Sequence, residues 1–180
     1  MLSFGITFAL TLAIGEFLDV TQSSEKLRRP YLEDLMEALK ANRLSWLKKC
    51  NYNEGAVRPC ASSANAMLLG NECEFDYGYV KNGSFTKQHF YSTLSDSEKG
   101  PVMAVKREKG GADAFAYTMR YLNKEERCAI FTHMDKGNEK CELYMWDDFI
   151  EAPTEQCDQA YNRICKRTVT VYKEDCQAFA

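Results

Sequence analysis

Eight cysteines in a chain of 180 residues restrict the possible folds more than any other feature of the sequence. The count is even, and the two closest cysteines lie eight residues apart, so the chain has no C-x-x-C pair. In a small exported protein this pattern predicts a framework of four disulfides. Neither His89 nor His133 lies near a cysteine pair, so we expect no metal and no cofactor. The eight are Cys50, Cys60, Cys73, Cys128, Cys141, Cys157, Cys165 and Cys176.

The N-terminal segment agrees with export. The first fifteen residues, MLSFGITFALTLAIG, are apolar and uncharged, and they end in small residues that suit a cleavage site. The run is too short to cross a bilayer. A buried N-terminal helix is the alternative, because the usual Lys or Arg before the apolar region is absent. We expect a signal peptide at residues 1–15, a single domain at residues 16–180, and secretion to the extracellular space.

Charge and motifs exclude several classes of function. The net charge is -3 and no basic stripe is present, so we expect no binding to nucleic acid or to a membrane. The chain has no G-x-S-x-G, no phosphate-binding loop and no H-E-x-x-H. His89 and His133 have no evident catalytic partners. We therefore expect a protein that is not an enzyme and has no catalytic residue.

Apolar periodicity predicts two helices. Leu32, Leu35 and Leu39 recur at three- and four-residue steps within Pro30–Ala41, which indicates an amphipathic helix. A second short helix is expected over Pro153–Ile164, because proline is favoured at the first helical position.

Between these helices, short aromatic and β-branched runs are separated by turn signals such as Asn82-Gly83 and Gly110-Gly111. The expected strands are Leu44–Cys50, Val57–Met67, Cys73–Lys81, Ser84–Thr93, Val102–Glu108, Ala114–Leu122, Arg127–His133, Cys141–Trp146 and Thr168–Tyr172. Many antiparallel strands with one helix before them and one after predict an all-β fold, a meandering sheet closed into a barrel.

The segment KCELYMWDD, Lys140 to Asp148, poses the main functional question. Alternation along a strand places Glu142, Tyr144 and Trp146 on one face. The acid could simply face water, which is the default for a strand glutamate. Inside a barrel it would need a cationic partner such as a protonated amine, because an unpaired buried carboxylate costs several kcal/mol. The sequence pattern leaves both interpretations open.

Aromatic residues alternate along a second predicted strand. Phe115, Tyr117, Met119 and Tyr121 would share one face of it. Phe115 and Tyr117 are candidate cavity walls, with ordinary core packing as the alternative. An eight-stranded barrel is wide enough to hold one small ligand.

The sequence Asn82-Gly83-Ser84 is an acceptor for N-glycosylation in an expected hairpin turn. The same Asn-Gly pair is also what a tight turn requires. We expect Asn82 to carry a glycan.

Several segments resemble the salivary lipocalins of ticks, the group that contains the histamine-binding proteins. CELY, residues 141–144, is similar to the family's C-E-L-W element, with Tyr144 in place of Trp. ERCAIF at 126–131 resembles the preceding strand, and VYKEDC at 171–176 resembles the terminal Tyr-to-Cys element. DLMEAL at 34–39 is similar to the D-A-W-x-A-L helix, with Met36 in place of Trp. The resemblance runs from Pro30 to Cys176. It implies an eight-stranded antiparallel up-and-down β-barrel, a lipocalin, with an N-terminal and a C-terminal helix.

The resemblance also implies a disulfide scheme. The family pattern pairs Cys60 with Cys176 and Cys128 with Cys157, and it suggests Cys141–Cys165 as the third bond. Cys50–Cys73 is the pair that then remains.

The resemblance further implies a binding function. Glu142 and Tyr144 would point inward as amine contacts, and Trp146 on the same face would add cation–π attraction. Asp34 matches the acid of the helix motif and is a further candidate contact. The expected activity is sequestration of a biogenic amine, such as histamine or serotonin, by a monomer that suppresses the host's inflammatory response.

Two alternatives stay open. The cavity could hold a lipid mediator such as a leukotriene or fatty acid, whose carboxylate would meet Arg120 or Lys106. The chain could instead bind a host protein, as an inhibitor of complement or clotting that acts through its outer loops.

Overall fold

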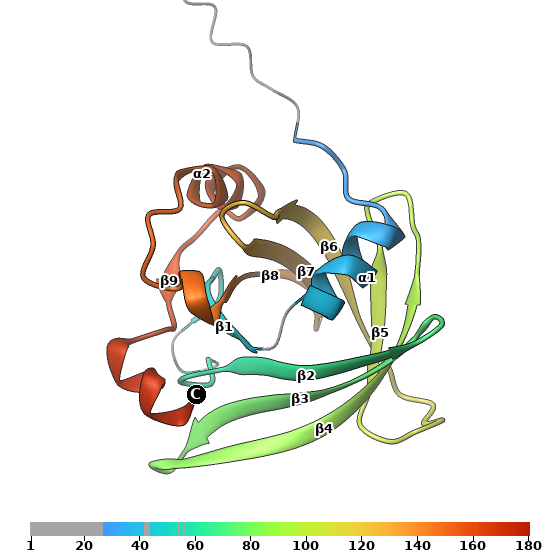
Figure 1. Cartoon of the computed structure of the whole chain (residues 1–180), viewed down its shortest axis with the longest axis horizontal. Helices are drawn as coiled ribbons and strands as arrows, with labels where there is room; N and C mark the ends of the chain where they lie inside the picture. Colours follow the sequence, from blue (N-terminus) through green and yellow to red (C-terminus); the bar gives the residue numbers. More distant parts are fainter. Residues whose placement is uncertain (1–26, 42–43, 54, 56) are drawn as a thin grey trace, which may run out of the picture.

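Eight antiparallel strands close into a barrel, with one helix across an end and a second helix against the outer wall (Figure 1). The computed structural model describes residues 27–41, 44–53, 55 and 57–180; the expected signal peptide at 1–15 lies outside these ranges. The strand order is β2-β3-β4-β5-β6-β7-β8-β1-β9, and an additional pairing of β1 with β2 closes the ring. All strand pairings are antiparallel.

The elements follow one another in a simple meander. They are α1 (Leu32–Ala41), β1 (Leu44–Cys50), β2 (Ser62–Leu69), β3 (Glu72–Lys81), β4 (Ser84–Ser95), β5 (Val102–Lys106), β6 (Phe115–Asn123), β7 (Cys128–Asp135), β8 (Asn138–Trp146), the short helix η2 (Asp147–Phe149), α2 (Glu155–Ile164), β9 (Val169–Thr170) and the short helix η3 (Glu174–Phe179). Each expected strand and helix is present; β1 has the expected bounds, and the ends of the other elements are shifted. In the described part of the chain no helix is long and apolar enough to cross a membrane.

Two of the differences from the expected elements have a clear physical cause. The second strand starts at Ser62 rather than Val57, because Cys60 adopts a positive φ of 50° that ends extended backbone before it. In β6 the register shifts between Met119 and Tyr121. This bulge turns Tyr121 away from the barrel interior and against the outer wall cluster, so the expected four-residue face is wrong at its last position.

The outer face of the β7–β8–β1 wall carries a cluster of buried side chains, as the interior of the barrel does. Alternation on β8 sends Cys141, Leu143 and Met145 outward, where α2 covers them. Leu143 and Tyr161 are both fully buried there. We call this cluster the outer core. Its buried members are Trp46, Cys60, Cys128, Ile130, Cys141, Leu143, Met145, Ile150, Cys157, Ala160, Tyr161, Cys165, Tyr172 and Cys176.

All three disulfides of the described residues lie in the outer core. Cys60–Cys176, Cys128–Cys157 and Cys141–Cys165 have Cα–Cα distances of 5.2, 6.3 and 5.8 Å. These are the three pairs that the family resemblance implies. They tie α2 and the C-terminal segment to the barrel wall.

The fourth expected disulfide, Cys50–Cys73, is wrong, because both cysteines are free and buried. β1 and β3 run in the same direction, and Trp46 and Gly78 lie at one level through their common partner Ser62. Cys50 lies four residues beyond that level and Cys73 five residues before it, a separation of roughly 30 Å along the strands. A disulfide needs Cα atoms within about 7 Å. Burial raises the pKa of both thiols.

The two ends of the barrel differ. Helix α1 closes one end, with Leu35 and Ala38 buried against the interior. The opposite end is formed by the β1–β2, β3–β4, β5–β6 and β7–β8 connections. The β3–β4 connection is the exposed turn Asn82-Gly83, in which both residues have positive φ, as a two-residue hairpin requires. The glycan on Asn82 stays a prediction.

Candidate ligand-binding site

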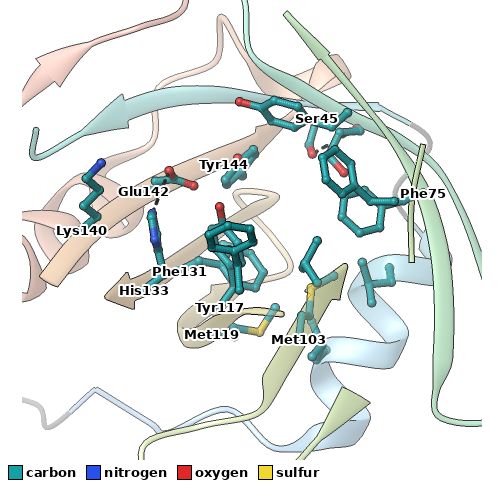
Figure 2. Close-up of a pocket in the computed structure, with 18 of the residues that line it drawn as sticks. Ser45, Phe75, Met103, Tyr117, Met119, Phe131, His133, Lys140, Glu142 and Tyr144 are labelled. Carbon is teal, nitrogen blue, oxygen red and sulfur yellow. Dashed lines mark hydrogen bonds and ion pairs between the residues drawn. The ribbon is translucent and has the colours of Figure 1, made fainter. Parts of the chain in front are cut away.

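A cavity of about 380 Å³ occupies the barrel between α1 and the loop end. Figure 2 shows side chains from several strands and from α1 pointing into it. Its size falls within the range of pockets that enclose a small molecule. The lining residues are Leu35, Ala38, Leu39, Ser45, Tyr52, Arg58, Ser63, Phe75, Tyr77, Phe90, Met103, Val105, Arg107, Phe115, Tyr117, Met119, Ala129, Phe131, His133, Met134, Asp135, Lys140, Glu142, Tyr144 and Trp146.

Glu142 is the buried carboxylate of this cavity. Glu142 lies on β8 and is 5% exposed. The hydroxyl of Tyr52 donates a hydrogen bond of 2.6 Å to Oε1. Among the described residues Oε2 has no hydrogen-bond partner. Burying a carboxylate oxygen without a hydrogen-bond donor destabilises the protein. Oε2 is therefore suited to accept a hydrogen bond from a ligand.

His133 lies beside this carboxylate, and the two side chains point toward each other in Figure 2. Nε2 of His133 is 3.4 Å from Oε1 of Glu142, which is ion-pair distance, but no hydrogen bond forms between them. The imidazole also packs on the ring of Tyr117, with 4.5 Å between centroids. His133 therefore adds a second buried nitrogen-bearing ring to the polar part of the cavity.

Four phenols surround the carboxylate. Burial, followed by the negative charge of Glu142, raises the pKa of Tyr52, Tyr77, Tyr117 and Tyr144. These groups therefore stay protonated and offer hydroxyl donors as well as aromatic faces. Rings around a carboxylate are the arrangement that attracts an organic cation.

The wall nearer α1 is mostly apolar, with the hydroxyls of Ser45 and Ser63 as its polar groups. Phe75 and Phe90 stack there with centroids 5.9 Å apart, and Met103 and Met119 lie buried opposite α1. The cavity is therefore amphipathic along its length, with polar groups toward the loops and hydrocarbon toward the helix. Such a shape suits a ligand with a polar head and an apolar body.

The structure places five of the six expected contact residues in the lining. Glu142, Tyr144, Trp146, Phe115 and Tyr117 all face the cavity, and Phe115 stands at its exposed mouth with 52% exposure. Their roles in binding a ligand remain predictions.

Asp34, the sixth expected contact, is absent from the described lining of the cavity. Its carboxylate accepts a hydrogen bond of 3.0 Å from the backbone N–H of Tyr31 at the start of α1. It also pairs with Arg28 at 2.9 Å and lies 3.8 Å from the ammonium of Lys124. These contacts stabilise the first turn of the helix, so the carboxylate is already satisfied.

Arg120 and Lys106, the expected partners of a lipid carboxylate, are likewise absent from the described lining. Arg120 lies 3.5 Å from Glu139. The cations that do line the cavity are Arg58, Arg107 and Lys140, and Lys140 forms an ion pair with Asp135.

Sequence reasoning missed Tyr52 and His133. Tyr52 follows the end of β1, where no periodicity indicates its direction. His133 has a usable signal, because it shares a face with Phe131 on β7 and that face meets Glu142 of β8.

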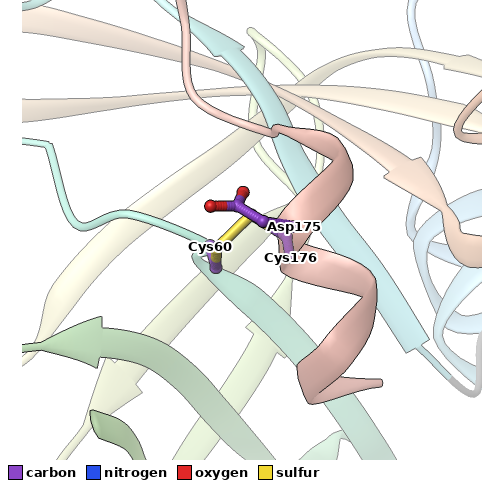
Figure 3. Close-up of side chains that lie close together, drawn as sticks. All are labelled: Cys60, Asp175 and Cys176. Carbon is purple, nitrogen blue, oxygen red and sulfur yellow. A yellow bond between two sulfur atoms is a disulfide. The ribbon is translucent and has the colours of Figure 1, made fainter. Parts of the chain in front are cut away.

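A second cluster, Cys60, Asp175 and Cys176, brings two sulfurs and a carboxylate together (Figure 3). The sulfurs are joined to each other in a disulfide and are not thiolates. Only the carboxylate remains to hold a cation, so the cluster is structural.

Residues 30–178 match the family model described as tick histamine binding protein. The chain belongs to the tick histamine binding protein family. This assignment covers the barrel, both long helices and the C-terminal segment. The family and the fold are those of ligand-binding lipocalins.

Solved structures agree with this fold of the histamine binding protein family. The serotonin complex of AM182 has a TM-score of 0.61 at 16% identity, covering 79% of this chain and 91% of that one. Japanin from Rhipicephalus appendiculatus, bound to cholesterol, has a TM-score of 0.52 at 14% identity, covering 75% and 95%. Insecticyanin from the tobacco hornworm Manduca sexta has a TM-score of 0.55 at 12% identity, covering 84% and 87%. At these identities the likeness concerns the fold alone. No curated protein matches the chain.

Proposed function

We propose that this protein is secreted and sequesters a small aromatic amine, such as histamine or serotonin, within the barrel. The observation that carries the proposal is the buried carboxylate of Glu142. One of its oxygens is held by Tyr52, and the other has no donor among the described residues. A protonated amine supplies the missing donor and the compensating charge.

Further support comes from the surroundings of that carboxylate. The rings of Tyr77, Tyr117 and Tyr144 offer cation–π attraction of about 0.5–2 kcal/mol. The apolar wall near α1 gives an aromatic ring a place to pack. AM182, of the same fold, holds serotonin. In this proposal no bond is made or broken, and removal of the amine from host receptors suppresses the inflammatory response.

The test is the Glu142→Gln variant, measured by calorimetry with histamine and with serotonin. We expect affinity to fall about tenfold or more, because the amide keeps the shape but loses the charge. Glu139→Gln is the matched control, since Glu139 is exposed and lies on the same strand outside the described lining. Unchanged affinity in Glu142→Gln would remove the carboxylate from the site and contradict the proposal.

A further inference from the structure

Two exposed arginines line the mouth of the cavity. Arg58 lies in the β1–β2 connection and Arg107 follows the end of β5. Among the described residues neither guanidinium forms an ion pair, whereas the third cation of the mouth, Lys140, is neutralised by Asp135. Within the described part of the chain, the mouth therefore carries two positive charges without carboxylate partners.

Arg58 is held over the aromatic wall of the cavity. Its Cζ atom lies 4.3 Å from the ring centroid of Tyr79 and 5.7 Å from that of Tyr77. Stacking of this kind fixes a guanidinium while leaving its N–H donors free to bind an anion.

Two phenols lie within reach of both Arg58 and Glu142. Burial is the largest cause of the raised pKa of Tyr77 and of Tyr117, Glu142 raises it further, and Arg58 lowers it. Coulomb interactions weaken with distance, so each phenol lies near a negative and a positive charge. Arg58 is exposed, whereas Glu142 is only 5% exposed. The positive charge therefore lies nearer the mouth, and the negative charge lies deeper in the cavity.

We propose that Arg58 and Arg107 form an anion subsite at the mouth, so that the preferred ligand carries an acidic group outside its cationic nitrogen. This inference rests on the proposed function, because the nitrogen occupies the Glu142 subsite. The ligand class is an apolar body followed by a cationic nitrogen and then by a carboxylate, sulfonate or phosphate. Arginine binds each of these anions through paired N–H donors. The reverse order of charges would place the anion against Glu142.

Three probes with the same dodecyl tail test this order. Dodecylammonium carries only the cation, N-dodecyl-β-alanine carries an inner secondary ammonium and an outer carboxylate, and dodecylphosphoethanolamine carries an inner phosphate and an outer ammonium. Each cation has an N–H donor for Oε2 of Glu142. Affinities are measured by calorimetry below the micelle concentration of each probe. We expect the wild-type protein to bind N-dodecyl-β-alanine about tenfold more tightly than either of the other two.

The double variant Arg58→Gln with Arg107→Gln should abolish the preference for N-dodecyl-β-alanine and leave the affinity for dodecylammonium equal or higher. Arg120→Gln is the matched control, because Arg120 lies outside the described lining and pairs with Glu139. Equal binding of N-dodecyl-β-alanine and dodecylphosphoethanolamine, or an unchanged preference in the double variant, would overturn the anion subsite and leave the amine proposal intact. If Glu142→Gln binds dodecylammonium as tightly as the wild type, the cationic subsite is wrong and both proposals fall.

Discussion

The two faces of strand β8 have opposite properties. Leu143, on the outer face, is fully buried in the outer core, between disulfides and helix α2. Glu142 and Tyr144, its neighbours along the chain, face a cavity and include a carboxylate oxygen without a donor among the described residues. The outer face supplies packing and covalent ties, and the inner face retains polar groups that packing would exclude. Stability and binding are thus assigned to opposite sides of one strand.

The largest expected effect comes from removing a side chain on the outer face. Leu143→Ala should lower the free energy of unfolding by about 3–5 kcal/mol, because it leaves a cavity in a closely packed cluster. Chemical denaturation measures this change. The folded fraction should bind ligand with wild-type affinity. A loss below about 1 kcal/mol would show that the outer core is loosely packed.

Removing a disulfide of the outer core should have the next largest effect. The Cys128–Cys157 disulfide spans 29 residues of sequence, and replacing both cysteines with alanine should cost about 2–5 kcal/mol. The paired control replaces Cys50 and Cys73, which form no disulfide in the structure, with alanine. Thermal unfolding under oxidising conditions compares the two. If the variant without Cys128 and Cys157 unfolded at the wild-type temperature, this disulfide would make no contribution to stability.

A change on the inner face should affect binding more than stability. Tyr144→Phe removes one hydroxyl from the cavity and keeps the ring. We expect amine affinity to fall about three- to tenfold, a loss of roughly 0.5–1.5 kcal/mol, with stability unchanged within about 0.5 kcal/mol. Calorimetry and denaturation of the same preparation measure both quantities. A large loss of stability would contradict the division between the two faces.

The smallest effect concerns an exposed cluster on the outer surface of β3 and β4, where His89 pairs with Asp76 at 2.8 Å and with Glu74 at 3.5 Å. The hydrogen bond to Asp76 is the first cause of the raised pKa of His89. A raised pKa in the folded state stabilises the protein below the unfolded pKa, and the contribution is lost as pH rises through the folded pKa.

Stability should therefore fall by only a few tenths of a kcal/mol between about pH 5.5 and pH 8.5, since water screens this pair. Denaturation of the wild type and of His89→Gln at both pH values isolates the contribution. An equal pH dependence in the two proteins would exclude His89 as its source.

The sequence predicts which residues of β8 share a face, but it does not predict which of the two faces points into the barrel. Alternation correctly grouped Glu142, Tyr144 and Trp146. Both faces of the strand are buried, because α2 covers the outer one, so hydrophobicity alone does not distinguish them. The family's C-E-L-W element supplied the missing information.

The differences between the expectations and the structure have local causes. The carboxylate of Asp34 bonds to the first turn of α1, a role that a motif match cannot separate from ligand binding, and its contact with a ligand stays a prediction. The pairing of Cys50 with Cys73 by elimination is wrong, because the sequence does not show that the two cysteines lie toward opposite ends of the barrel. Tyr52 lies beyond the end of a strand, where side-chain direction depends on tertiary contacts rather than on period.

The position of the three disulfides has a consequence for how such a protein can diversify. None of the three involves β3, β4 or β5, the strands that supply Phe75, Tyr77, Phe90 and Met103 to the cavity. Mutations on those strands can reshape the interior while the cross-linked side preserves the fold. Proteins with this arrangement of disulfides can therefore change the ligand that they bind without evolving a new fold.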